Sequence, residues 1–219
     1  MFSIAKVTFL IVSALFPIVN PLGGAPIFLS LTNYYSTEQR KILSRRIAIN
    51  SFLLLVGSFF IGTHILAFFG ISIPVVQVGG GLVVMSAGWK MLNQNEEHDS
   101  RQDVHRTVDL RDLFGRAFYP LTLPLTVGPG SISIAITLGA NEPQEGMLHS
   151  IIGAVIGMLL IAIGVYLCYG FADRLASVLG ATAMTIVMRL SSFLLVCIGF
   201  QILWNGFSAL LKTLPVVHH

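Results

Sequence analysis

Residues 16–26 read FPIVNPLGGAP, and residues 119–130 read YPLTLPLTVGPG. Together these two segments contain six of the nine prolines of the 219-residue chain, along with four glycines. A constant offset of 103 relates their prolines, pairing Pro17 with Pro120, Pro21 with Pro124 and Pro26 with Pro129. Because proline removes a backbone donor and clashes with the preceding turn, we expect both clusters to break or unwind the helix that contains them.

The composition around these segments is that of a membrane protein. Hydrophobic residues make up 54% of the chain and charged residues only 11%, whereas soluble domains carry about 25% charged residues. This excludes a soluble globular domain and predicts several membrane spans. The thirteen Lys and Arg residues are spread thinly over short loops, so we expect no nucleic-acid partner.

The lengths of the stretches without a charged residue give the number of membrane spans. These stretches contain 31 residues after Lys6, 43 after Arg46, 25 after Arg116, 27 after Glu145 and 22 after Arg189. A crossing helix needs about 20 residues, so the longest stretch holds two crossings that turn around residues 70–74, where Pro74 stops one helix and starts the next. The sequence predicts an all-α polytopic membrane protein with six transmembrane helices, at about 5–32, 45–69, 73–93, 117–139, 147–172 and 186–209.

An internal repeat follows from this count. The proline-rich segments lie in the first and fourth spans, and spans three and six correspond weakly at an offset of 111, where Gly88 meets Gly199. Each half has three spans, so the second half enters the membrane from the opposite side. We expect two inverted three-helix repeats with broken helices one and four, a transporter architecture. Residues 1–93 form the first repeat, 94–116 a cytoplasmic linker loop, and 117–219 the second repeat. The alternative is that the prolines merely kink the helices for packing.

The positive-inside rule gives the orientation. Eleven Lys and Arg residues fall in the loops after spans one, three and five, and only Lys6 and Lys212 fall on the other side. Both termini are therefore predicted on the non-cytoplasmic side of the membrane.

Unwound backbone cannot face lipid, so both proline-rich segments should line a cavity. Free N–H groups at the helix ends could bind a substrate carboxylate, and freed carbonyls an ammonium group or a sodium ion. The candidate substrate-binding residues lie around the two breaks: Asn20, Pro21, Gly23, Gly24, Thr122, Thr126, Gly128, Gly130 and Ser131. Asn20 ranks first because an amide both donates and accepts; its alternative role is to cap the following helix.

Other polar residues in the spans are candidates for a gate or for coupling: His64, Gln77, Arg189 and Gln201. Each has an alternative role. His64 could be hydrogen-bonded at the membrane interface, the two glutamines could form hydrogen bonds between helices, and Arg189 could extend to the lipid headgroups. No Asp or Glu lies well inside a span, so sodium coupling or uncoupled exchange fits better than a proton relay.

Small residues in the spans have structural explanations. The glycines at 79–81 and at 153, 157 and 164 are expected at close helix contacts, and Cys168 and Cys197 are expected to be small buried apolar residues. No metal site is predicted, and no cofactor other than a coupling sodium ion.

The two proline-rich segments, together with the stretches from Gly70 to Leu92 and from Arg189 to Gln201, resemble the MarC family of six-span inner-membrane proteins. The likeness covers nearly the whole chain. It implies an inner-membrane location and a relation to amino-acid exporters of the lysine-exporter type. Some members of the family are associated with small neutral amino acids.

The function predicted from these features is secondary transport, inward or outward, of small solutes by alternating access around the two broken helices. Small neutral amino acids are the favoured substrates. The alternative is a channel, or a structural subunit of a membrane complex. An enzyme is not expected, because no nucleophile–base pair or metal motif occurs. Homo-oligomerisation stays open.

Overall fold

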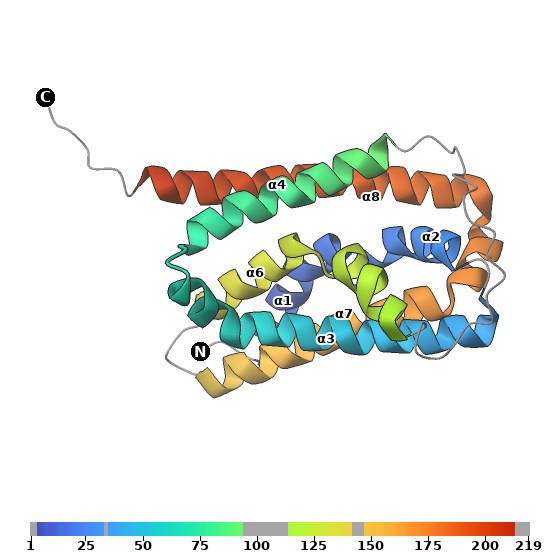
Figure 1. Cartoon of the computed structure of the whole chain (residues 1–219), viewed down its shortest axis with the longest axis horizontal. Helices are drawn as coiled ribbons and strands as arrows, with labels where there is room; N and C mark the ends of the chain where they lie inside the picture. The colour runs from blue at the N-terminus through green and yellow to red at the C-terminus, as the bar shows by residue number, and fades with distance from the viewer. Residues whose placement is uncertain (1–3, 33–34, 94–113, 142–146, 213–219) are drawn as a thin grey trace, which may run out of the picture.

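A computed structural model describes residues 4–32, 35–93, 114–141 and 147–212. Most of the expected linker loop (residues 94–113) and the terminal histidines lie outside these ranges. Within the described residues every regular element is helical (Figure 1). In chain order the elements are α1 (Ile4–Val19), α2 (Pro21–Leu31), α3 (Thr37–Phe68), α4 (Ile73–Leu92), the irregular helix η1 (Ala117–Thr126), α6 (Pro129–Ala140), α7 (Met147–Gly170) and α8 (Ala172–Leu211).

The predicted all-α membrane architecture is confirmed. Five stretches of the described chain are long and apolar enough to cross a bilayer: Ile4–Leu29, Thr37–Phe68, Ile73–Leu92, Leu148–Gly170 and Thr185–Leu211. The bent pair Phe114–Thr126 and Pro129–Ala140, whose halves meet at 71°, passes the same test only when its two halves are taken together, and it makes a sixth crossing if the pair is one span. The turn between spans two and three falls at Gly70, as expected, where φ is +67° and glycine is favoured.

The helices form two layers, with the short segments α2, η1 and α6 between them (Figure 1). One layer is the pair α4 and α8, which lie side by side along most of their length. The other contains α1, α3 and α7, and its buried side chains include Ile11, Leu15, Leu55 and Met158. The short helices α2 and α6 connect the layers, since α2 contacts α8 and α7 while α6 contacts α3 and α4.

Glycines bring the backbones of α4 and α8 into direct contact. A Cβ atom on Gly88 would lie 2.8 Å from both the Ser192 carbonyl oxygen and the Val196 nitrogen. A Cβ on Gly199 would overlap the backbone nitrogen of Met85. Because backbone atoms cannot move aside as side-chain ends can, any larger residue here would push the two helices apart.

The contacts at Gly88 and Gly199 are reciprocal. Adding the offset of 111 to Met85 gives Val196, and adding it to Gly81, whose carbonyl oxygen is 2.8 Å from the Cβ position of Gly199, gives Ser192. A two-fold relation between α4 and α8 produces this pattern. The inverted repeat of three helices each stays a prediction.

Glycines on α7 make the same kind of contact with α1. A Cβ on Gly153 would lie 2.9 Å from the Ile4 carbonyl oxygen, and one on Gly157 would lie 3.2 Å from the Thr8 carbonyl oxygen. The Thr8 hydroxyl donates to the Gly153 carbonyl at 3.0 Å. The close-contact role expected for these two glycines is therefore confirmed.

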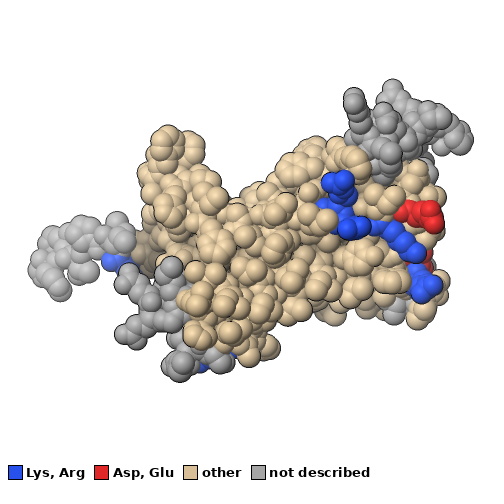
Figure 2. Space-filling model, turned by 90° about the horizontal axis from the view of Figure 1, so that it is seen from below, with Lys and Arg blue, Asp and Glu red and all other residues tan. Residues whose placement is uncertain are grey.

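Basic residues gather at one end of the molecule, where α3 and α8 begin and α4 ends (Figures 1 and 2). The described members of this group are Arg40, Lys41, Arg45, Arg46, Lys90, Arg116, Arg174 and Arg189. Arg40 pairs with Asp173 and donates to the Tyr35 carbonyl at 3.0 and 3.1 Å, which joins the start of α3 to the start of α8. The first turns of α8 are separated from its spanning part by Gly180, with φ +74°.

Candidate functional site

The first span is interrupted at Asn20. This residue adopts the left-handed conformation, with φ 46° and ψ 58°, and Pro21 is the first residue of α2. The Asn20 Oδ1 atom accepts a hydrogen bond from the Gly23 N–H at 3.1 Å, so the side chain caps α2. A Cβ atom on Gly23 would overlap the Asn20 amide, which explains why glycine stands there. Of the two roles considered for Asn20, the structure therefore shows capping.

The interruption is much shorter than expected. Pro17 lies inside α1 and Pro26 inside α2, so only Asn20 departs from helical geometry. The expected break is therefore present, but it is confined to a single residue. A single proline within a packed helix removes one hydrogen bond and can be accommodated by bending and by neighbouring helices.

The fourth span is interrupted more extensively. Within η1, Tyr119 (φ −124°, ψ 125°) and Leu123 (φ −113°, ψ 121°) are extended. Each directly precedes a proline, and the proline ring disfavours helical geometry in the residue before it. The broken helices predicted for spans one and four are thus both present, with different extents.

Two threonine hydroxyls stabilise this irregular segment. The Thr122 hydroxyl donates to the Ala117 carbonyl at 2.6 Å, and the Thr126 hydroxyl donates to the Leu121 carbonyl at 2.7 Å. Both threonines are almost completely buried. Their hydroxyl protons therefore satisfy backbone carbonyls inside the protein, where an unpaired carbonyl would cost several kcal/mol.

The helix that follows, α6, begins with an uncapped N-terminus. Gly128 is its N-cap residue and makes no side-chain capping bond, and Pro129 is its first residue. The Ser131 hydroxyl donates to the Gly128 carbonyl at 2.9 Å. Pro129 therefore corresponds structurally to Pro21, each starting the helix after a break, so the offset of 103 does not match the two breaks.

A cavity of about 200 Å³ lies where the two interruptions meet α4. Its polar lining side chains are Asn20, Thr126 and Ser131, and no lining residue is Asp, Glu, Lys, Arg or His. The apolar, glycine and proline part of the lining is Ile18, Val19, Gly24, Ile27, Val83, Val84, Ala87, Met91, Pro124, Leu125, Gly128, Pro129, Gly130 and Leu195. We call this space the central cavity.

Six of the nine candidate binding residues line the central cavity: Asn20, Gly24, Thr126, Gly128, Gly130 and Ser131. The other three do not. Pro21 and Gly23 are buried in the first turn of α2, and Thr122 is buried beside Asn50, whose Nδ2 lies 3.4 Å from the threonine hydroxyl.

Tyr169 connects the two interruptions and was missed by the sequence reasoning. Its hydroxyl lies 3.1 Å from the Thr126 hydroxyl, and its ring stacks on Phe28 with centroids 4.8 Å apart. A Cβ atom on Gly24 would overlap the Tyr169 hydroxyl. The available signal was a tyrosine inside an apolar span, since a buried phenol needs a hydrogen-bond partner.

The candidate gate residues lie outside the lining of the central cavity. His64 is exposed near the end of α3, 3.5 Å from the Thr63 hydroxyl, and Arg189 is exposed near the start of the last span. Their roles as gate or coupling residues stay predictions.

The two glutamines differ. Gln77 on α4 donates to the Thr137 hydroxyl on α6 at 3.4 Å, which is the expected interhelical bond. Gln201 donates to Asn205, one turn later on the same helix, at 2.9 Å. The hydrogen bond of Gln201 is therefore made within α8 and not between helices, and the side chain is exposed.

The cysteines have no site chemistry around them. Cys168 is half-buried, but Cys197 is exposed, so the expectation of burial is wrong for Cys197. It lies on an exposed face of α8. Among the described residues no group of three His, Cys, Asp or Glu side chains could hold a metal ion.

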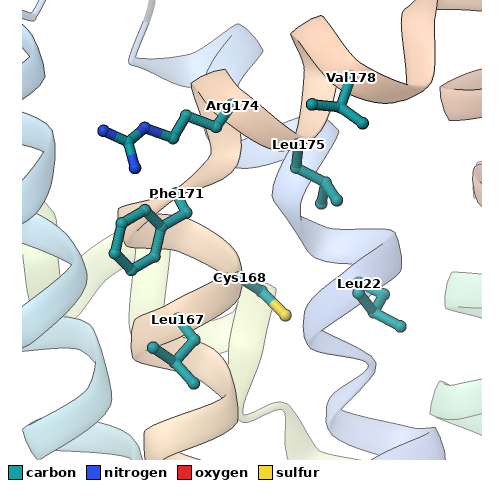
Figure 3. A pocket seen from close by; sticks show the side chains of 7 residues that line it. All are labelled: Leu22, Leu167, Cys168, Phe171, Arg174, Leu175 and Val178. Carbon is teal, nitrogen blue, oxygen red and sulfur yellow. The ribbon is translucent and has the colours of Figure 1, made fainter.

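A larger hollow of about 390 Å³ lies on the outside of the protein, between α2 and the junction of α7 and α8. Figure 3 shows the side chains that line it, from Leu22 on α2 to Cys168, Leu175 and Val178 on α7 and α8. Arg174 is the one charged residue of its lining, and its guanidinium lies 5.7 Å from the Phe171 ring centroid. With so few polar groups this hollow suits lipid chains, and solute recognition is better served by the central cavity.

The structure thus defines a multi-pass helical membrane protein in which two interrupted spans border a small, uncharged cavity. The chain belongs to the MarC family, because the sequence model of this family, described as "MarC family integral membrane protein", matches residues 5–211.

Individual relatives agree over almost the full length. The membrane protein YvbG of Bacillus subtilis is 28% identical over 203 residues, covering 92% of this chain and 94% of its own. The inner membrane protein MarC of Salmonella typhimurium and that of Escherichia coli O1:K1 are each 29% identical over 205 residues, covering 91% of this chain and 93% of their own. No solved structure matches the chain.

Proposed function

We propose that this protein is a secondary transporter that moves small neutral amino acids by alternating access around its two interrupted spans. The single observation that carries the proposal is the central cavity, which both interruptions border and which contains backbone, hydroxyl and amide groups but no charged side chain.

The chemistry of the cavity favours a zwitterion with an uncharged side chain. Burying an isolated ion is expensive, so a cavity without charged side chains disfavours a ligand of net charge. A zwitterion has zero net charge, and its two ends can be met by helix-end N–H groups and by carbonyl oxygens. A volume of about 200 Å³ restricts the ligand to a small molecule.

The two interruptions would have different roles in binding. The start of α2 is already capped by Asn20, whereas the start of α6 has no side-chain cap and borders the cavity at Gly130 and Ser131. We therefore assign the substrate carboxylate to the N-terminus of α6. The oxygen of the Asn20 side-chain amide accepts the capping hydrogen bond, so its Nδ2 group remains to donate to the substrate from the first interruption.

Alternating access requires the two interruptions to move relative to each other. Breaks in helices are natural hinges, because few backbone hydrogen bonds cross them. The bend of 71° between η1 and α6 and the left-handed Asn20 would serve as the two hinges. In this scheme Tyr169, which contacts both interrupted spans, stabilises one of the two conformations.

Membrane location, orientation and energy source complete the proposed function. The related Salmonella and E. coli proteins are named inner membrane proteins, and we propose the same location here. The basic end would face the cytoplasm, with both termini on the opposite side. We propose a gradient-driven, non-enzymatic process with sodium as the candidate coupling ion; homo-oligomerisation stays open.

Counterflow in proteoliposomes tests the proposal. Vesicles preloaded with one unlabelled amino acid receive the labelled form outside, over a panel of glycine, alanine, serine, leucine and lysine, each with and without sodium. Saturable exchange of the small neutral members, with lysine excluded, is the expected result. Sodium dependence would identify the coupling ion.

If no amino acid of the panel is exchanged although the protein is inserted in the vesicles, the assignment of amino acids as substrates is overturned. A channel would instead give flux that does not saturate and does not depend on the preloaded solute. A structural subunit would give no flux at all.

A further inference from the structure

The apolar wall of the central cavity is one face of α4. Val83, Ala87 and Met91 all line the cavity and follow one another at intervals of four residues, which places them on the same side of the helix. The polar lining side chains come from elsewhere, namely from the cap of α2, from η1 and from α6. A bound molecule would therefore meet polar groups on one side and α4 on the other.

This wall is held in place from behind. A Cβ on Gly81 would lie 2.7 Å from the Gly199 carbonyl oxygen, and one on Gly88 would lie 2.8 Å from the Ser192 carbonyl oxygen. The backbone of α4 thus rests directly on the backbone of α8 on either side of Ala87 in the sequence. Since packed backbones yield very little, α4 has no room to retreat from a larger ligand.

Ala87 lies at the centre of the wall and has its smallest side chain. It is exposed, so its methyl group is not covered by another side chain, whereas the neighbouring Val84 is buried against Gly130. Each carbon added at position 87 would take space from the bound molecule. Each carbon removed would add space.

We infer that Ala87 sets the upper size limit of the substrate side chain. The inference rests on the proposed function, because it assumes that a small zwitterionic amino acid binds in the central cavity with its polar groups toward the interruptions and its side chain toward α4. Ala87 is then a specificity-determining residue, and the substrates are amino acids with short uncharged side chains.

The test measures binding and transport side by side in purified protein. The ligands are glycine, alanine, 2-aminobutyrate, valine and leucine, which grow by single carbon atoms or small groups. Binding is read from ligand-induced thermal stabilisation in detergent, and transport from counterflow in proteoliposomes. The variants are Ala87→Gly, Ala87→Val and Ala87→Leu, and the matched control is Ser86→Val, an adjacent exposed residue outside the cavity lining.

We expect the largest accepted ligand to become smaller in Ala87→Val and smaller again in Ala87→Leu, and to become larger in Ala87→Gly. At the cut-off, one added carbon should change relative affinity at least about tenfold, the range of discrimination by apolar pockets. Ser86→Val, outside the lining, should behave as the unaltered protein for all five ligands.

The outcomes separate this inference from the proposed function. Transport with an unchanged cut-off, or an equal loss for every ligand, would overturn the role of Ala87 while leaving the carrier intact. A shifted binding cut-off without any counterflow would support Ala87 and overturn the carrier. Absence of binding by all five ligands to the unaltered protein would overturn both.

Discussion

The hydroxyl of Tyr169 occupies the space that a side chain on Gly24 would need. A Cβ atom there would overlap the tyrosine oxygen, which also lies 3.1 Å from the Thr126 hydroxyl. One side chain of α7 therefore fixes the distance between the first and the fourth span. Gly24 is explained by this contact, and its φ angle is not in the positive range.

Gly24→Ala should destabilise the protein by about 1–3 kcal/mol, the usual range for overpacking a close-packed site. The variant Tyr169→Phe should restore part of this loss, because it removes the overlapping oxygen while the ring carbon remains 3.2 Å from the added Cβ. Unfolding of both single variants and the double variant in detergent gives the coupling energy. Additive effects of the two substitutions would contradict the contact.

The two proposed roles of Asn20 are separable by comparing Asn20→Gly with Asn20→Ala. Glycine accepts the left-handed φ of 46° and costs only a few tenths of a kcal/mol as a cap, whereas alanine loses the cap at about 1 kcal/mol and is strained. If Asn20 only shapes the break, transport should survive better in Asn20→Gly.

If the Asn20 amide also binds substrate, both variants should lose affinity to a similar degree. Gln77→Ala is the control, because Gln77 bonds to Thr137 away from the cavity lining and should leave substrate affinity unchanged. A larger affinity loss in Gln77→Ala than in either Asn20 variant would move the site away from the first span.

Close contact between α4 and α8 predicts strong position dependence for glycine replacement. Gly88→Ala and Gly199→Ala should each destabilise by at least about 1–3 kcal/mol, because the added carbon meets backbone atoms of the partner helix. Gly57→Ala on α3, where no atom lies within 4 Å of the Cβ position, should instead stabilise by about 0.5–1 kcal/mol through helix propensity. Equal effects at the three positions, measured by thermal unfolding, would contradict the packing described.

Position 130 offers a direct test of how α6 meets α4. A Cβ on Gly130 would overlap the Val84 side chain, so Gly130→Ala should impair both stability and transport. Val84→Ala creates space on the opposite side, and the double variant should recover stability relative to Gly130→Ala alone. Failure of the second substitution to improve the first would place the damage elsewhere, for example in the start of α6.

Much of this architecture could be predicted because membrane spans follow from length and hydropathy alone. The six spans and both interruptions were predictable from charge-free stretches and prolines. The sequence could not predict whether Pro17 and Pro26 bend or break their helices. That outcome depends on the neighbouring helices, which a local sequence pattern does not describe.

Only part of the cavity lining could be predicted from the sequence, for the same reason. Asn20 and Gly128 could be named because the breaks are local features, but Val83, Ala87 and Met91 read as an ordinary apolar helix face. Tyr169 has its role only because α7 passes beside both interruptions. The position of Thr122 outside the cavity lining could not be predicted, since nothing in the sequence says that its hydroxyl donates to the Ala117 carbonyl.

The central claim is that a substrate passes through the cavity between the two interruptions, and Gly128→Leu tests it most directly. Gly128 lines the cavity, so Leu would fill space needed by a ligand. The Gly128 Cβ position is 3.2 Å from the Pro124 carbonyl oxygen, so the single carbon of Ala requires a shift of only a few tenths of an ångström, and Gly128→Ala should keep its exchange activity. Counterflow of labelled alanine is measured in proteoliposomes that contain equal amounts of inserted protein. The account predicts saturable exchange in the unaltered protein and in Gly128→Ala, and none in Gly128→Leu. Normal exchange in Gly128→Leu would contradict it.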